Sequence, residues 1–272
     1  MRKRSSSPSL SETADGSSYG DSRLVTSLAR GMGILRVFGD GTNALGNQDI
    51  ATRTGLPKPT VSRLTYTLTA LGYLSYSQET GRYQLGTGVL SLGYACLAGM
   101  GIQKMSRSLM QGLAEYSGVS VALGGRDHLD MIYLECRKGN SAVHLALDTG
   151  SRIDLATSAL GRAYFVGVSE TEQESLKRDI AEKNPGTWKT IHAGLEKAQR
   201  DYKQYGFTIS LGDWTKEVHG VGVPFFPNIN GDILALNCGG PSYLLKPEKL
   251  INDLGPRLIK LARDINAEVN RY

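Results

Sequence analysis

The chain has 272 residues and a formal net charge of +5, and its length predicts one or two domains, with two favoured. Hydrophobic residues make up 40% of the chain and charged residues 21%, so most of it can bury a core. No apolar run reaches the roughly 18 residues of a membrane-spanning helix, and no apolar stretch follows the basic N-terminus. These features exclude a membrane protein and make a secretory signal unexpected.

Positive charge is concentrated in one part of the chain. Residues 1–22 are rich in Ser and Gly, lack periodicity and predict a disordered tail. Residues 23–100 carry seven basic and three acidic side chains, a net charge of +4. A basic module is the electrostatic footprint of a nucleic-acid binder, although an ordinary solvated basic surface is the alternative.

Three helices and a hairpin are expected within residues 23–86. The first helix begins at Val25 and repeats apolar residues at helical spacing, namely Val25, Leu28, Met32 and Leu35. The second covers Gln48–Thr54, with Asn47 as its cap and Gly55 as its end. The third starts near the two prolines of Leu56–Thr60 and runs to about Leu71. Strands at 73–76 and 82–85, joined by a turn, complete a winged helix-turn-helix.

The second and third helices have the geometry of a DNA-reading pair. Ala51 allows close helix approach, Gly55 supplies a positive φ, and Val61 packs the third helix back on the second. Such a unit places the third helix in the major groove. Arg63 can pair with a guanine edge or a phosphate, and Arg82 beside the turn can reach phosphate or the minor groove. The candidate DNA-binding residues are Lys58, Pro59, Thr60, Ser62, Arg63, Tyr66 and Arg82.

The rest of the chain is expected to form a linker helix, 87–102, and a mixed α+β domain, 103–272. Strands are predicted at 119–124, 129–136, 143–147, 206–211, 219–226 and 232–238. Helices are predicted at 157–168, 170–183, 188–204 and 247–269, and Pro256 should kink or restart the last of them. Hairpins of strands with helices in blocks favour an antiparallel sheet covered by helices.

Several segments of the first half resemble the IclR family of bacterial transcriptional regulators, in the order in which that family carries them. They are Ser27–Leu35, Asp49–Ala51, Thr54–Leu64, Leu71–Leu74 and Tyr83–Gly86. The resemblance covers about 65 residues. It implies a sequence-specific regulator that binds double-stranded operator DNA as a homodimer or homotetramer.

A weaker resemblance extends into the second half. Thr157–Ala163 resembles the small-residue helix beside the family's effector pocket, and Gly220–Pro224 and Ala235–Pro241 resemble its last two core strands. The family often carries a longer segment where this chain has Glu217–His219. The resemblance implies a GAF-like effector-binding domain that senses a small metabolite, commonly a carboxylate or aromatic acid.

The residue types of Thr157–Ala163 agree with an anion site. Thr157 or Ser158 can cap the helix, and its free backbone N–H groups and dipole favour negative charge. The alternative is that the small residues only let the helix pack closely on a sheet. By strand alternation, only one of Asn237 and Cys238 can face the pocket. The candidate effector-binding residues are Ser158, Ala159, Leu160, Gly161, Arg162, Asp213, Trp214 and Cys238, with Tyr133 and His144 as weaker candidates.

Nothing in the sequence indicates an enzyme, a cofactor or a metal. The four histidines are scattered, and no nucleophile elbow, phosphate-binding loop or zinc spacing is present. The three cysteines, Cys96, Cys136 and Cys238, fit reduced thiols in the cytoplasm better than a disulfide framework. The main alternative function is a winged-helix docking or sensory module with no operator of its own.

Overall fold

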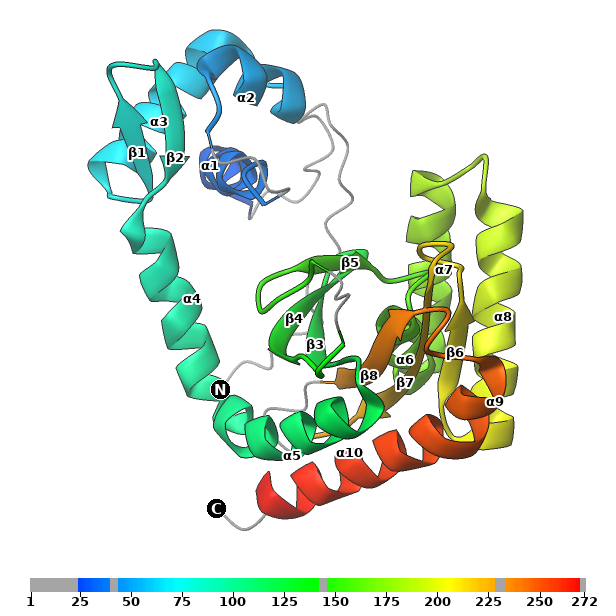
Figure 1. The fold of residues 1–272 in the computed structure, drawn as a ribbon. Coiled ribbons are helices and arrows are strands. Elements are labelled where there is room, and N and C mark those ends of the chain that lie inside the picture. The colour runs from blue at the N-terminus through cyan, green and yellow to red at the C-terminus, as the bar shows by residue number, and fades with distance from the viewer. Residues whose placement is uncertain (1–23, 40–43, 142–145, 228–232, 270–272) are drawn as a thin grey trace, which may run out of the picture. The chain divides into compact units, whose positions relative to one another are not determined.

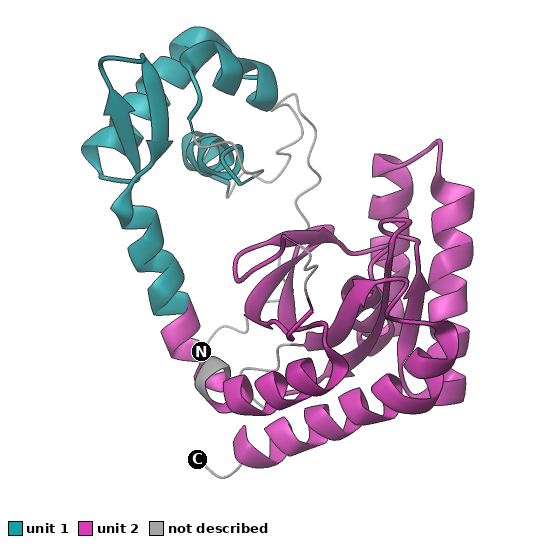
Figure 2. Ribbon diagram, viewed as in Figure 1, with its two compact units in different colours: residues 1–96 teal, residues 97–272 magenta. Residues whose placement is uncertain are grey.

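The computed structural model describes residues 24–39, 44–141, 146–227 and 233–269, and the chain divides into two compact units, 1–96 and 97–272 (Figure 2). The division falls inside the segment expected to be a linker helix. Among the described residues, no helix is both long and apolar enough to cross a membrane.

The first unit contains three helices and a two-stranded antiparallel sheet (Figure 1). These elements are α1 (Thr26–Arg36), α2 (Asn47–Thr54), α3 (Lys58–Ala70), β1 (Leu74–Ser77) and β2 (Arg82–Leu85). Its core is formed by the buried side chains of Ile34, Phe38, Ile50, Val61 and Leu68, among others. The winged helix-turn-helix predicted from the sequence is therefore present.

One local expectation for this unit is wrong, and the apolar stripe of its first helix does not face the core. Val25, Leu28 and Met32 are 62%, 64% and 50% exposed, whereas Ile34 of α1 and Phe38, which follows the helix, are buried in the core. Asn47 does not cap α2; the cap is Gly46, whose N–H donates to the Asp49 carboxylate at 3.0 Å.

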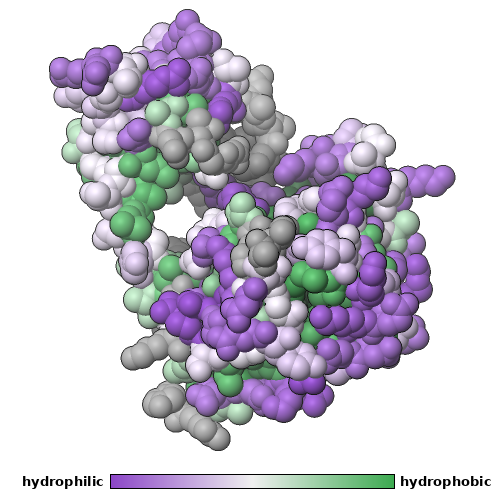
Figure 3. All heavy atoms as spheres, viewed as in Figure 1, coloured by the Kyte–Doolittle hydropathy of each residue, from purple (hydrophilic) through white to green (hydrophobic). Residues whose placement is uncertain are grey.

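Two helices, α4 (Thr87–Met100) and α5 (Ile102–Ser117), follow and are separated by Gly101. No residue of α4 is charged, and most of its described side chains are exposed. Leu90, Leu92 and Tyr94 are 61%, 55% and 67% exposed. Figure 3 shows this as a green band along the helix. In the single chain, α4 therefore presents an apolar surface to solvent.

The second unit is built on one antiparallel sheet with the strand order β5-β4-β3-β8-β7-β6. The strands are β3 (Ser120–Asp127), β4 (Asp130–Arg137), β5 (Arg152–Asp154), β6 (Thr208–Leu211), β7 (Val218–Phe225) and β8 (Leu234–Pro241). The sequence missed β5, which is only three residues long. The strand expected at 143–147 lies largely outside the described residues, and Ala146 and Leu147 are not in a strand.

Helices cover both faces of this sheet (Figure 1). α5 and α10 (Gly255–Val269) pack together on one face, and α6 (Ala159–Gly167) lies on the other. α7 (Glu170–Lys183) and α8 (Trp188–Tyr205) pack against α6. The two faces bury separate apolar clusters. The predicted mixed architecture is therefore confirmed.

The C-terminal helix restarts where Pro256 was expected to disturb it. A short turn, α9 (Pro247–Lys249), leads into a π-helical turn, Leu250–Leu254, before α10. The Gly255 N–H bonds to the Leu250 carbonyl, five residues back. Proline has no N–H and crowds the carbonyl four residues earlier, and the wider π turn accommodates it.

The alternation of glycine and valine in β7 sets the position of α6. Val221 and Val223 are buried in the cluster beneath α5 and α10. Gly222 faces α6, and a Cβ there would lie 2.2 Å from the Ala159 carbonyl oxygen and 3.0 Å from the Ala163 Cβ. Only glycine permits this approach, which holds the start of α6 directly on the sheet.

Candidate functional site

The α2–turn–α3 segment has the geometry of a helix-turn-helix. Gly55 ends α2 in the left-handed conformation with φ 68°, as the sequence predicts. Ala51 is 8% exposed and Val61 is fully buried, so the two helices pack closely. The Asn47 amide also donates to the Ser62 hydroxyl at 2.9 Å, which ties the start of α2 to α3.

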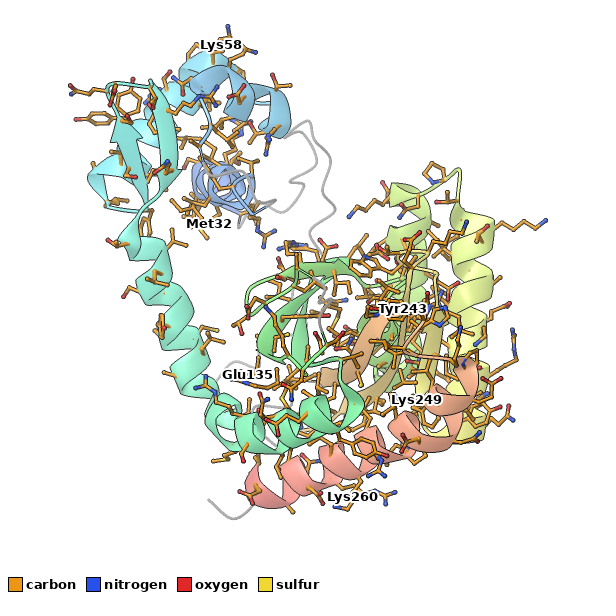
Figure 4. All side chains as sticks on the ribbon, in the orientation of Figure 1. Met32, Lys58, Glu135, Tyr243, Lys249 and Lys260 are labelled. Atoms are coloured by element: carbon orange, nitrogen blue, oxygen red, sulfur yellow. The ribbon has the colours of Figure 1, made fainter. Side chains whose placement is uncertain are left out.

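One face of α3 is polar and open to solvent. Lys58, Pro59, Ser62, Arg63 and Tyr66 are exposed, and Thr60 is half-buried. Lys58 stands at the surface of the first unit, where α3 begins (Figure 4). The side chains of Lys58 and Arg63 make no hydrogen bond or ion pair with another residue that the structure describes. Their charges are therefore available to an external partner.

Arg82 differs from the other candidates because its guanidinium is already bound within the unit. It donates to the Ala44 carbonyl at 3.0 Å and pairs with the Asp49 carboxylate at 3.3 Å. The same Asp49 oxygen accepts the capping N–H of α2. In this arrangement Arg82 joins the wing to the helices, and its charge is locally neutralised.

A small open pocket lies between the start of α6 and the sheet, and the empty space of about 450 Å³ around it includes open solvent at its mouth. Both polar and apolar residues line it, and its lining among the described residues includes no Lys, Arg, Asp or Glu. The lining residues are Ser120, Tyr133, Leu147, Ile153, Ser158, Ala159, Ser210, Trp214, Val218, His219, Gly220, Asn237 and Gly239.

The start of α6 forms one wall of this pocket. Ser158 caps the helix, and its hydroxyl accepts the Gly161 N–H at 3.0 Å. Ser158 and Ala159 line the pocket. Leu160 instead packs in the core, and Gly161 abuts the Leu155 backbone, where an added Cβ would lie 2.1 Å from the carbonyl oxygen. The first turn of α6 directs its positive dipole end toward the pocket.

Arg162 and Asp213 form an ion pair that supports the pocket wall without lining it. Arg162 is 2% exposed; it pairs with Asp213 at 2.7 Å and donates to the Ala156 carbonyl at 3.1 Å. Gly194 of α8 makes room for the guanidinium, since a Cβ there would lie 2.2 Å from Arg162 Nη2. The pair holds the loop that follows β6 in place. Trp214, the residue after Asp213 in this loop, lines the pocket.

Strand alternation separates Asn237 from Cys238. Asn237 lines the pocket, whereas Cys238 is fully buried in the cluster beneath α5 and α10. Burial raises the pKa of the Cys238 thiol to about 12, so it stays neutral. Cys238 therefore does not line the pocket, because it is on the opposite face of the sheet. His144 lies outside the described residues.

Tyr133 lies beside Asn237 at the sheet wall of the pocket. It is 3% exposed, and burial raises the pKa of its hydroxyl, an effect that a hydrogen bond with Asn237 partly offsets. The sequence analysis did not select Ser120, Ser210 or Ile153, which also line the pocket. These residues face the pocket because of the register of the strands that carry them. The one feature of the sequence that could have indicated this is the period-two alternation of side chains along each strand.

A helix-turn-helix with an exposed, partly basic helix face, followed by an α/β unit with a pocket, defines the class of helix-turn-helix transcriptional regulators that carry a second domain. Comparison with known proteins identifies the family. A sequence profile of the IclR helix-turn-helix domain matches residues 27–78, and one of the bacterial transcriptional regulator IclR C-terminal domain matches residues 94–267. The chain belongs to the IclR family, whose members are DNA-binding regulators and not enzymes.

Individual relatives agree with this assignment. The chain is 33% identical over 248 residues to the HTH-type transcriptional regulator TsaQ1/TsaQ2 of Comamonas testosteroni, covering 90% of this chain and 89% of that one. An IclR family regulator from Brucella abortus is 42% identical, with a TM-score of 0.87, over 96% of this chain and 99% of that one. An IclR homologue from Microbacterium hydrocarbonoxydans, solved with 4-hydroxybenzoate, shares the fold at 19% identity and a TM-score of 0.68, over 90% and 100% of the two chains.

Proposed function

We propose that this regulator reads an operator sequence with α3 and that a small organic or aromatic acid in the α6 pocket controls its binding to DNA. The observation that carries the first part is the exposed face of α3, on which the side chains of Lys58 and Arg63 have no hydrogen-bond or ion-pair partner among the described residues. On a helix-turn-helix, the N-terminal half of the second helix meets base edges in the major groove.

The residues of this face divide by the contacts they can make. Arg63 has the fork geometry that recognises guanine, and Ser62 can hydrogen-bond a base edge or a phosphate. Lys58 and Thr60, at the start of α3, are suited to phosphate contacts. Tyr66 is 77% exposed, although it is large and aromatic, which fits a surface that a partner covers.

The pocket supports the second part of the proposal. The start of α6 offers backbone N–H groups and a positive dipole end to an anion. Trp214, Tyr133, Leu147 and Ile153 give the remaining wall flat and apolar surfaces. A planar acid would place its carboxylate at α6 and its ring among these side chains. The 4-hydroxybenzoate bound by the Microbacterium hydrocarbonoxydans homologue belongs to this ligand class.

Exposed apolar side chains support a homodimer, and a tetramer can form from two such dimers. They lie on α1, on its N-cap residue and on the uncharged helix α4. Apolar surface of this kind usually marks a protein interface, and two copies would present two recognition helices to a two-fold operator. Light scattering should therefore give at least twice the chain mass. The free cysteines fit a cytoplasmic protein. The apolar residues are Val25, Leu28, Met32, Leu90, Leu92 and Tyr94.

Fluorescence polarisation with the DNA upstream of the protein's own gene tests the DNA-binding part. Binding should be tighter than to scrambled DNA and should weaken steeply with salt. Arg63→Ala should cost about 1–3 kcal/mol and relax preference at one base pair if Arg63 reads a base. Equal weakening on all sequences would assign Arg63 to phosphate. No binding even at low salt would favour a docking module without an operator.

A further inference from the structure

The wing, which consists of β1, β2 and the turn between them, is bonded directly to the segment that leads into α2. Leu45 and Tyr83 exchange two backbone hydrogen bonds, with N–O distances of 3.0 and 2.8 Å. Leu45 is 2% exposed, so this contact belongs to the core of the unit. Beside it, the Arg82 guanidinium donates to the Ala44 carbonyl at 3.0 Å. The residues before α2 are therefore held along β2.

Two side chains extend this contact into the helices. One carboxylate oxygen of Asp49 accepts both the Gly46 N–H at 3.0 Å and the Arg82 guanidinium at 3.3 Å. The Asn47 amide donates to the Ser62 hydroxyl at 2.9 Å. A continuous series of contacts therefore runs from Arg82 in the wing, through the start of α2, to the exposed face of α3.

The charge of the wing argues against a direct contact with DNA phosphates. From Leu74 to Leu85 the sequence has two charged side chains, Glu79 in the turn and Arg82, so the net charge of the wing is zero. Phosphate contacts use Lys and Arg side chains whose charge is not already compensated. Arg82 is paired with Asp49, and a move of Arg82 to a phosphate would leave that carboxylate uncompensated.

We infer that Arg82 is a positioning residue for DNA recognition, which acts through Asp49 and the start of α2 on the side chains of α3 and adds no phosphate contact. The inference rests on the proposed reading of DNA by α3. It has a consequence that separates it from a phosphate contact. Loss of Arg82 should lower the preference for the operator, because base contacts are misplaced, while the number of neutralised phosphates stays the same.

DNA binding by the full chain tests the inference. Duplexes that the unmodified protein enriches from a random-sequence library supply the operator probe. Fluorescence polarisation at several salt concentrations then compares this probe with a scrambled duplex. For Arg82→Gln, the preference for the operator should fall about 2- to 5-fold, the range that a half-exposed ion pair can contribute. The slope of log affinity against log salt concentration should match that of the unmodified protein.

Two further variants complete the design. Lys58→Gln is the matched control, because Lys58 is exposed and has no side-chain partner among the described residues. Its loss should reduce the salt slope by about one and weaken both duplexes alike. Asp49→Asn breaks the ion pair from the other side, while its amide oxygen can still accept the Gly46 N–H. The preference should fall again, which decides the matter even if Arg82→Gln does not fold.

The results that would overturn the inference are distinguishable. Equal weakening of both duplexes by Arg82→Gln, with a salt slope reduced by about one, would assign Arg82 to a phosphate and leave the reading of DNA by α3 intact. A lower fraction of active protein with unchanged preference and slope would limit Arg82 to a role in folding. If the unmodified protein enriches no sequence, the proposed reading of an operator is wrong, and the positioning role is wrong with it.

Discussion

Substituting Gly222 by alanine should separate α6 from the sheet and so disturb both stability and ligand binding. The added Cβ would lie 2.2 Å from the Ala159 carbonyl oxygen, a backbone atom that cannot rotate away. Non-bonded heavy atoms are in favourable contact at about 3.5–4.0 Å, so α6 or β7 must move by about 1 Å. Overpacking of this kind costs about 1–3 kcal/mol.

The assay is equilibrium unfolding of the full chain, followed through the second unit. For a unit of this size, a loss of about 1–3 kcal/mol corresponds to a fall in melting temperature of about 2–12 °C. Affinity for an acid in the pocket should fall as well, because Ala159 lines the pocket and is the residue displaced.

Gly112 provides a matched control on α5. It is exposed, and an added Cβ there would meet no atom within 4 Å. Gly112→Ala should raise stability by about 0.5–1 kcal/mol, since alanine is the better helix former. If Gly222→Ala were as stable as the unmodified protein and bound acids equally well, the account of how glycine positions α6 would be refuted.

Three further predictions concern the pocket wall and the core. Ser158→Ala should cost about 1 kcal/mol of unfolding free energy through loss of the α6 cap, and an unchanged denaturation midpoint would contradict the capping role. Asp213→Asn alone should lower the free energy of unfolding more than Asp213→Asn combined with Arg162→Met, because the single change leaves the buried Arg162 guanidinium without its ion-pair partner. A double-mutant cycle measures this difference, and additive effects of the two changes would argue against coupling between them. Burial raises the pKa of Cys238 in the folded protein, so its thiol ionises at a lower pH in the unfolded protein than in the folded one, and the free energy of unfolding should fall as pH rises from about 9 toward 12. Cys238→Ala should reduce this loss of unfolding free energy between pH 8 and 10 by about 1 kcal/mol. An identical pH profile for the variant would contradict this.

The sequence predicts the helix-turn-helix well because its signals are local. Gly55 must adopt a positive φ between two helices, and the third helix is set by prolines at its start and leucines along one face. The stripe at Val25, Leu28 and Met32 predicts a helix but not the direction it faces, because periodicity does not distinguish a face that packs in its own core from one that another chain can cover.

The pocket could be predicted only in part because its walls depend on long-range contacts. The sequence placed Ser158 and Ala159 correctly at the start of a helix. Arg162, on the same helix, is a candidate effector-binding residue from the sequence, yet its guanidinium is paired with Asp213, 51 residues later, and does not line the pocket. The choice between Asn237 and Cys238 required the register of β8 against its neighbours, which a single strand does not reveal.

The central claim is that one acid in the α6 pocket changes operator affinity, and a single titration tests it directly. Operator binding is measured by fluorescence polarisation with and without a saturating acid whose occupancy calorimetry has established, using its methyl ester as the control. The account predicts that the acid shifts the dissociation constant by about 5- to 150-fold, as typical coupling energies allow, and that the ester does not. An unchanged operator affinity at full occupancy of the pocket would contradict the account.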